Sequence, residues 1–330
     1  MRILVKGAGV AGLAVAQELA SNGFAVDVAD VAPSIGAGAS WLAGGMLAPW
    51  CERESADERV LTAGKAAADW WDAALPGEVT RNGTLVVAPP RDTGELARFA
   101  ARTSGYEWLD EDGIAALEPA LAGRFRKGLF FREEAQLDPR RALNALQRSL
   151  QAKGVRFCFG VSDDFPEHDF DRVIDCSGSA AIGKIGDLRG VRGEMLYLET
   201  AALALSRSVR LLHPRPPIYV VPRGDERFMV GATMIESDVG GQPTARSIME
   251  LLNAAYALHP AFGEAGVIDA GAGVRPAFPD NFPRVFRAGN VLHVNGLYRH
   301  GFLLAPAIAR EVARMLAAPG MKQPMTGAMP

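Results

Sequence analysis

Residues that cross-link a chain or bind metal are scarce in this sequence of 330 residues. The three cysteines, Cys51, Cys158 and Cys176, are scattered, odd in number and without metal-ligand spacing, so we expect buried, reduced thiols. The five histidines form no H-x-x-x-H pair and have no C-x-x-C companion, which argues against zinc. We therefore expect no metal site.

A bias toward one sign of charge is also absent. The chain has 35 Lys and Arg against 38 Asp and Glu, a net charge of −3. This balance gives no electrostatic reason to expect nucleic acid or an anionic membrane as a partner. No apolar run approaches the ~18 residues that a membrane span requires. A strand is expected to begin at Arg2, directly after Met1, so we expect no signal peptide and a cytoplasmic protein.

The first thirty residues contain a strand–turn–helix–strand pattern. A buried strand is expected over residues 2–6, a helix over 13–22 and a second strand over 24–30. The turn after the first strand has the form G-x-G-x-x-G, in which the glycines are Gly7, Gly9 and Gly12. In this context the motif predicts a bound dinucleotide, either NAD or FAD.

Each position of the motif has a physical role. Gly7 permits a tight turn, Gly9 lets the backbone approach a pyrophosphate, and Gly12 allows the helix to pack closely on the strand. The helix N-terminus offers free N–H groups and a positive dipole end to the anion. Asp30, 18 residues beyond Gly12, is placed to accept hydrogen bonds from ribose hydroxyls. A glycine-rich turn without a ligand is the alternative.

A run of small residues follows the second strand, over residues 34–49. So many glycines and alanines would allow the backbone to approach a flat ligand closely. A flexible surface linker is the alternative, but Trp41, Leu42, Met46 and Leu47 are too apolar for that role. We interpret the segment as covering a cofactor.

The remaining sequence predicts a mixture of helices and strands. Helices are expected over residues 56–75, 93–104, 110–117, 140–152, 245–257 and about 303–316. Strands are expected over 129–131, 155–160, 172–176, 195–199, 218–222 and 227–232, and a hairpin over 79–90 with Asn82 and Gly83 at its turn. Trp70 and Trp71 are expected in the core or an interface, and residues 319–330 are expected to be disordered.

This order of elements predicts two joined domains, as the length also does. Strands and helices alternate in three separated pieces, which are expected to form the nucleotide-binding domain: residues 1–77, 139–190 and 270–330. The β-rich residues 78–138 and 191–269 are expected to form an inserted domain over the cofactor, a plausible place for substrate.

Several segments together resemble the D-amino-acid oxidase superfamily of FAD enzymes, and most closely its glycine oxidases of bacterial thiamin biosynthesis. They occur in the family's order at residues 5–13, 38–49, 137–139, 175–178, 191–195, 230–233, 273–276 and 296–306. The resemblance implies an α/β fold with a Rossmann-like FAD-binding domain and an inserted mixed or antiparallel β-sheet substrate domain. It also implies non-covalent FAD, since the C-terminal third contains no cysteine that could carry the flavin.

The family's FAD contacts can be carried over to matching positions. Asp30 would hold the adenosine ribose, and Gly44, Gly45 and Met46 would pass near flavin N5. A helix that begins near residue 301 would direct its positive end at the flavin N1–C2=O edge, which gains negative charge on reduction. The full expected set is Gly7, Gly9, Val10, Ala11, Gly12, Asp30, Ala39, Ser40, Gly44, Gly45, Met46, Val161, Ser177, Gly178, Arg275, Arg299, His300, Gly301, Phe302 and Leu303.

Three residues are expected to act on the substrate. Arg275, in a G-x-R-P motif, would clamp the substrate carboxylate bidentately, because a guanidinium suits that geometry. Tyr219 matches a family tyrosine that contacts the carboxylate, with a core tyrosine as the alternative. Arg299 would lie near the substrate or the flavin's pyrimidine edge. His300 fits either this site or an ordinary loop, and Tyr197 and Met234 are further candidates for its lining.

The resemblance implies oxidative deamination of glycine, sarcosine or a small D-amino acid by hydride transfer to flavin N5. The imine would hydrolyse to a 2-oxo acid and ammonia, and O₂ would reoxidise the flavin to give H₂O₂. Transfer of the imine to a thiazole synthase is implied by resemblance alone, and a homo-oligomer is expected. Open alternatives are a general D-amino-acid oxidase, a flavin dehydrogenase with a quinone acceptor, an NAD dehydrogenase and a redox-silent nucleotide-binding module.

Overall fold

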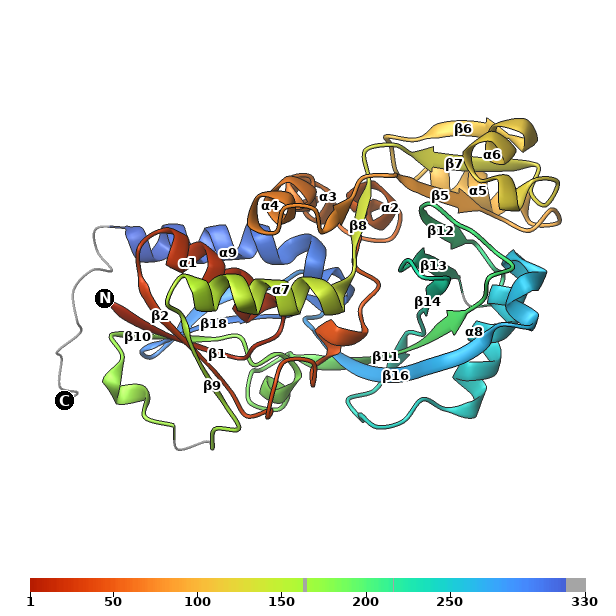
Figure 1. Cartoon of the computed structure of the whole chain (residues 1–330). Helices are drawn as coiled ribbons and strands as arrows, with labels where there is room; N and C mark the ends of the chain where they lie inside the picture. The colour runs from red at the N-terminus through yellow and green to blue at the C-terminus, as the bar shows by residue number, and fades with distance from the viewer. Residues whose placement is uncertain (163–164, 216, 319–330) are drawn as a thin grey trace.

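A computed structural model of the chain describes residues 1–162, 165–215 and 217–318. The tail expected to be disordered, residues 319–330, lies outside the described residues. The described chain forms two large sheets, one at each end of the molecule, and a small three-stranded sheet (Figure 1). None of the helices in the described ranges is long and apolar enough to cross a membrane.

The first sheet has six strands in the order β17-β18-β10-β1-β2-β9. All neighbours are parallel except β17, which is antiparallel to β18. The five parallel strands therefore follow the 3-2-1-4-5 order of a doubly wound fold, whose ligand crevice lies where the order reverses, between β1 and β10. The strands are β1 (Arg2–Lys6), β2 (Ala25–Asp30), β9 (Arg156–Phe159), β10 (Arg172–Asp175), β17 (Arg284–Ala288) and β18 (Val291–Asn295).

Three long helices cover this sheet: α1 (Val10–Ser21), α7 (Pro139–Ala152) and α9 (Gly301–Ala317) (Figure 1). Their apolar faces and the strands form one hydrophobic core. Trp70 and Trp71, on α4 (Ala67–Ala74), are buried in it, as predicted, and Trp71 Nε1 donates to the carbonyl of Phe302 at 2.8 Å. This bond fixes the first turn of α9.

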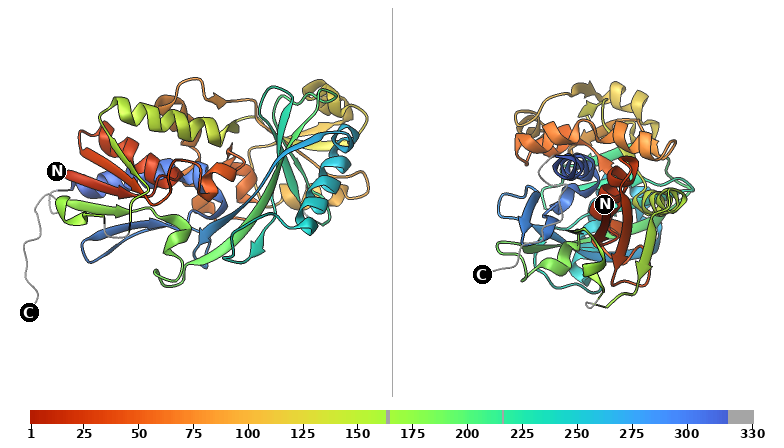
Figure 2. Two further views of the ribbon diagram at one scale, coloured as in Figure 1. Left: turned by 60° about the horizontal axis from the view of Figure 1, so that its bottom comes forward. Right: turned by 90° about the vertical axis from the view of Figure 1, so that its left-hand side faces the viewer.

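The second sheet has nine strands, in the order β15-β11-β14-β13-β12-β5-β7-β6 with β16 also paired to β11. Helix α8 (Ala245–Leu258) packs on it around a second core. The long strands β11 and β16 reach from this sheet toward the first one (Figure 2). The strands are β5 (Thr84–Val87), β6 (Glu107–Asp110), β7 (Lys127–Phe131), β11 (Arg189–Glu199), β12 (Ser208–Leu211), β13 (Ile218–Pro222), β14 (Arg227–Gly231), β15 (Ile235–Glu236) and β16 (Gly266–Ala277).

Shorter elements complete the described part of the chain. The small sheet has the order β3-β8-β4. Its strands are β3 (Met46–Leu47), β8 (Ala135–Leu137) and β4 (Val79–Thr80). The remaining α-helices in the described residues are α2 (Pro49–Arg53), α3 (Glu58–Gly64), α5 (Thr93–Ala100) and α6 (Glu111–Leu117). Short 3-10 helices are η1 (Ala39–Leu42), η2 (Pro119–Leu121), η3 (Glu167–Asp169), η4 (Gly178–Ala181), η5 (Pro260–Gly263) and η6 (Tyr298–His300).

The hairpin predicted over residues 79–90 is wrong. β4 pairs with β8 in the small sheet, whereas β5 pairs with β7 and β12 in the nine-stranded sheet. The chain crosses between the sheets at Gly83, whose φ of 75° and contact with Phe131 leave no room for a side chain. Asn82 Nδ2 donates to the carbonyl of Ser206 at 2.7 Å, so the expected turn residues tie two sheets together.

The single helix predicted over residues 56–75 is also wrong, because the chain forms α3 and α4 with a break between them. Gly64 ends α3 where it packs against Leu303, whose side chain would lie 2.8 Å from an added Cβ. Glycine is a poor helix former, and the break lets both short helices lie against α9. Other differences are smaller: α5 ends at Ala100 and not at the predicted residue 104, and α9 begins at Gly301 and not at about residue 303.

The cysteines and the expected domain limits can be compared with these elements. Cys51, Cys158 and Cys176 are free thiols; Cys51 and Cys176 are buried, while Cys158 is half-buried.

The fold class is the expected one, α/β with a Rossmann-like sheet and a mixed sheet. The limits at 190/191 and 269/270 fall inside β11 and β16, which pair with each other, so the exact division into domains stays a prediction.

Candidate active site

A cavity of about 670 Å³ runs from the end of β1 to the inner face of the nine-stranded sheet. This volume lies within the range of about 300–1,000 Å³ found for small-molecule and cofactor sites. Its walls come from the glycine-rich turn, the 34–46 segment, β13, β16 and the start of α9. The segments that the sequence singled out for a cofactor and for substrate therefore share one cavity.

The glycine-rich turn forms one end of this cavity. Gly7 has a φ of 103°, which favours glycine, and a Cβ at Gly12 would overlap the carbonyl oxygen of Gly7. Asp30 accepts from the N–H of Ala8 at 2.6 Å through Oδ2 and from Ala32 at 2.8 Å through Oδ1. The carboxylate is thus fixed at the cavity wall, with lone pairs left for hydroxyl donors.

The start of α1 faces the cavity beside Ser40. The N–H of Val10 donates to Ser40 Oγ at 3.1 Å, and a Cβ added to Gly9 would lie 3.3 Å from the same oxygen. The first N–H groups of a helix have no partner within the helix, and its dipole makes this end positive. Gly9 and Ala11 line the cavity at this point, so the arrangement suits a diphosphate.

Close backbone approach also defines the segment that ends at Met46. A Cβ at Gly44 would lie 2.6 Å from the ring of Tyr219, and Gly45, at φ 69°, would overlap the Leu137 carbonyl. Arg223 donates to the carbonyl of Gly44 at 2.6 Å and to that of Leu137 at 3.0 Å. The segment is therefore a fixed wall against which a flat ring system could lie.

Helix α9 closes the cavity with its N-terminus. Gly301, Phe302 and Leu303 line the wall, and a Cβ at Gly301 would lie 3.1 Å from Val10. The N-termini of α1 and α9 thus lie close together. Two positive helix ends in one cavity suit a cofactor that is anionic at its phosphates and becomes anionic at its ring on reduction.

Arg275 lies on β16 at the other end of the cavity. Its guanidinium occupies the space beside Gly193, where any Cβ would overlap it, and its Nη1 donates to the Thr233 carbonyl at 3.1 Å. Burial lowers the pKa of Arg275 below its ordinary value, opposed by Tyr219 and Tyr298, but a guanidinium stays protonated. Among the described residues, no carboxylate forms an ion pair with Arg275.

Tyr219 lies on β13 near Arg275. Its ring fills the space above two glycines, since a Cβ at Gly44 or Gly231 would come within 2.8 Å of it. Burial raises the pKa of the Tyr219 hydroxyl, with Arg275 acting in the opposite direction. The phenol is therefore neutral and able to donate a hydrogen bond at physiological pH.

Glu52, on α2, is the centre of a buried ion cluster in the cavity wall. Its Oε1 accepts from Arg210 Nη2 at 2.7 Å, while Arg299 Nε and His300 Nδ1 lie 2.8 Å and 3.2 Å from Oε2. The contacts to Oε2 lack hydrogen-bond angles and are electrostatic. Burial alone would raise the pKa of Glu52, but Arg299 and Arg210 hold it well below 4.5, and burial lowers the pKa of His300.

Most of the expected site residues meet in this cavity. Of the expected cofactor-binding and substrate-binding residues, Gly12 and Val161 do not line it: Gly12 packs under the turn, and the Val161 N–H donates to the Asp30 carbonyl at 3.2 Å. Met234 lines the cavity, whereas Tyr197 is buried outside it. The expected residues that line it are Gly7, Gly9, Val10, Ala11, Asp30, Ala39, Ser40, Gly44, Gly45, Met46, Ser177, Gly178, Tyr219, Arg275, Arg299, His300, Gly301, Phe302 and Leu303.

Glu52 and Arg210 line the cavity but were not predicted from the sequence. They lie 158 residues apart, on a short helix and on a strand that the sequence did not indicate. No local pattern distinguishes them from surface charges. Within the described parts of the chain, no group of three or more His, Cys, Asp or Glu could hold a metal ion.

A doubly wound sheet whose glycine-rich turn opens a helix at the ligand crevice is the arrangement typical of proteins that bind a dinucleotide cofactor. The chain belongs to the FAD dependent oxidoreductase (DAO) family, whose model matches residues 2–315. Its cofactor is therefore FAD, and the cavity described above fits that group at both helix ends and along the close backbone wall.

Individual proteins within and near this family resemble the chain in sequence or in structure. The chain is 69% identical over 96% of its length to "Putative thiamine biosynthesis oxidoreductase ThiO" of Rhizobium etli, of which it also covers 96%. It is 27% identical over 95% of its length to a "Bifunctional protein ThiO/ThiG" of Synechocystis, and spans about half of that protein, 51%. The glycine oxidase structure from Geobacillus kaustophilus has a TM-score of 0.78 at 20% identity, with 99% of this chain and 100% of that one covered, which shows the fold.

Proposed function

We propose that this FAD-dependent oxidoreductase deaminates glycine or another small amino acid oxidatively. The observation that carries the proposal is Arg275, a half-buried residue in the cavity wall whose guanidinium has no carboxylate partner among the described residues. A guanidinium that is partly removed from water and has no ion-pair partner is costly unless a ligand supplies the counter-charge. An α-carboxylate of a bound amino acid matches it in charge and in planar geometry.

The chain's own groups are expected to bind and orient the substrate. Arg275 holds the carboxylate, and the neutral Tyr219 hydroxyl donates a hydrogen bond to it. FAD, when bound, supplies the acceptor for the hydride of the substrate Cα–H bond. The residues that would hold FAD are those of the turn at Gly7–Gly12, the 39–46 segment and the start of α9. Because FAD would accept the hydride, the protein has only to orient the substrate and balance the charge of its carboxylate, and the reaction needs no nucleophilic side chain.

The product of the proposed reaction is an imine, which hydrolyses to a 2-oxo acid and ammonia, while O₂ takes the electrons to form H₂O₂. Because the amine must be neutral to release a hydride from the adjacent carbon, turnover should rise with pH. We also propose a role in thiazole formation for thiamin, supported by the name of the R. etli relative and by the ThiO/ThiG name of the Synechocystis protein. A cytoplasmic location and a homo-oligomer remain part of the proposal.

The test is a peroxide-coupled assay of the purified yellow protein in air with glycine, sarcosine and several D-amino acids. We expect H₂O₂ in an amount equal to the ammonia released from glycine or to the methylamine released from sarcosine, with one of these two substrates preferred. A preference for bulky D-amino acids would make the enzyme a general D-amino-acid oxidase. Flavin reduction by glycine without H₂O₂ release would indicate a dehydrogenase with another acceptor, such as a quinone.

A further inference from the structure

Three of the arginines that line the cavity, Arg210, Arg275 and Arg299, differ in their partners. Arg275 has no carboxylate partner among the described residues, whereas Arg210 and Arg299 both contact Glu52. Each oxygen of the Glu52 carboxylate faces a different guanidinium, at 2.7 Å and 2.8 Å. Of these three arginines, Arg275 is the one without a carboxylate partner in the described parts of the chain, and the other two share an internal anion.

We propose that Glu52 sets the charge of the substrate by occupying the position that a second substrate carboxylate would take. The inference rests on the proposed amino-acid oxidase function and concerns the same cavity. With Glu52 present, Arg275 is the one of these three cations left for an external carboxylate, so a monocarboxylic amine such as glycine is accepted. An amine with two carboxylates meets a carboxylate already seated on Arg210 and Arg299, and is repelled by it.

The surroundings of Glu52 support this role over a purely structural one. The carboxylate lines the cavity and its side chain is 13% exposed, so ligands can reach its neighbourhood. Arg299 is held in place by a second contact, from Nη2 to Ser55 Oγ at 2.6 Å, and Arg210 donates to the Cys51 carbonyl at 3.1 Å. Both guanidiniums thus keep a partner if the Glu52 charge is removed, and remain directed at the cavity.

The other charged groups that face this cluster do not replace Glu52. His300 is buried and its pKa is lowered by burial, so it is neutral and adds no charge. Glu54 also lines the cavity, but it pairs at 3.2 Å with Arg102, whose side chain is 60% exposed. Solvent screens that pair, and exposed ion pairs of this kind contribute little. Glu54 therefore serves as a matched control of the same residue type on the same segment.

The experiment compares the Glu52→Gln, Glu52→Asp and Glu54→Gln variants with the wild-type holoenzyme. Acetate and malonate are titrated into each yellow protein, and binding is followed by the change in flavin visible absorption. We expect Glu52→Gln to raise the affinity for malonate relative to acetate by about tenfold or more, the size of one charge-assisted hydrogen bond. Glu52→Asp, which keeps the charge, and Glu54→Gln should change this ratio less than about twofold.

An unchanged malonate-to-acetate ratio in Glu52→Gln, with flavin still bound, would overturn the proposal. If Glu52→Gln does not fold, the Glu52→Gln/Arg210→Gln double variant removes both members of the buried pair and still frees Arg299. That variant should also bind malonate better than the wild type does, and a wild-type ratio would again refute the role. The titration needs no turnover, so its outcome is separate from a failure of glycine to produce H₂O₂.

Discussion

Replacement of Arg275 by alanine removes the cation on which substrate recognition is proposed to depend. The half-buried guanidinium is fixed by the Thr233 carbonyl and packed against Gly193, so a substrate carboxylate would meet it without rearrangement. Loss of one member of a buried charge pair costs about 2–5 kcal/mol. This corresponds to a rise of about 30-fold to about 5,000-fold in KM for glycine.

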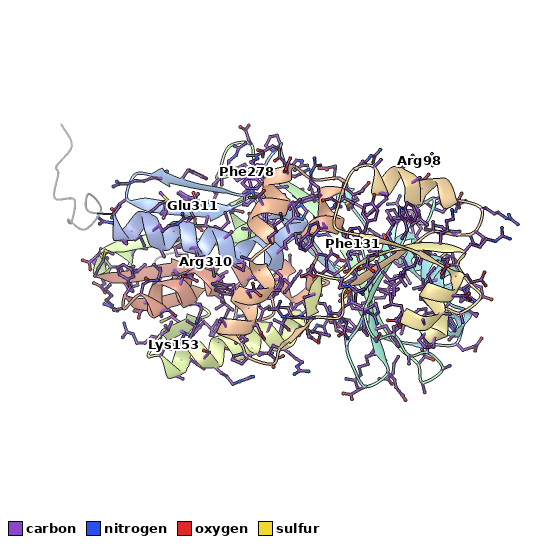
Figure 3. The ribbon with its side chains drawn as sticks, turned by 90° about the horizontal axis from the view of Figure 1, so that it is seen from above. Arg98, Phe131, Lys153, Phe278, Arg310 and Glu311 are labelled. Carbon is purple, nitrogen blue, oxygen red and sulfur yellow. The ribbon has the colours of Figure 1, made fainter. Side chains whose placement is uncertain are left out.

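The assay is steady-state peroxide production over a range of glycine concentrations, with flavin content measured on the same sample. Arg275→Lys keeps the charge but loses the planar two-pronged donor, so its KM should lie between those of the wild type and the alanine variant. Arg310→Ala is the control, because Arg310 lies on the outer part of α9 with its side chain 48% exposed (Figure 3). It should leave KM unchanged.

The reasoning would be refuted if Arg275→Ala bound a full complement of flavin and oxidised glycine with the wild-type KM. Substrate would then be held elsewhere in the cavity, and the absence of a carboxylate partner for Arg275 would have another explanation. A parallel loss of flavin would be a different failure, because it would place Arg275 in cofactor binding alone.

Three further predictions concern folding and cofactor retention. Gly12→Val should destabilise the fold by about 1–3 kcal/mol and lower the flavin content, because its side chain would overlap the Gly7 carbonyl; Gly94→Ala, with open space around it in α5 and outside the cavity lining, should do neither. Trp71→Ala should lower the free energy of unfolding in urea by about 3–5 kcal/mol. Burial raises the pKa of Glu134 to about 7 from 4.5, so the charge of this group should cost up to about 3 kcal/mol of stability as pH rises through that interval. Glu134→Gln should therefore stabilise the protein at pH 8 relative to pH 5, and an equal effect at both pH values would contradict this.

The parts of the site that could be predicted are those encoded over short stretches of chain. The turn from Gly7 to Gly12 lies between two strands and a helix in direct succession, so the sequence shows both the motif and its context. Arg275 was indicated by its G-x-R-P neighbours and by family resemblance. In each case residues adjacent in sequence are adjacent in the cavity wall.

The parts that could not be predicted depend on pairing between distant segments. Strand β12 was missed because Ser208 and Arg210 are polar residues in a buried strand, and their partners, Gln136 and Glu52, come from elsewhere in the chain. Burial of the Arg210 guanidinium in a strand is costly unless a carboxylate such as Glu52 pairs with it. For the same reason the role of Glu52 cannot be read from the residues around it.

The central claim is that this flavoprotein takes electrons from a small amino acid held by Arg275. The most direct measurement is the visible absorption of the purified yellow protein under anaerobic conditions after addition of glycine or sarcosine. The account predicts that the flavin band bleaches in the wild type and does so only at much higher glycine concentration in Arg275→Ala. A band that persists with every small amino acid, in a protein whose flavin dithionite still reduces, would contradict it.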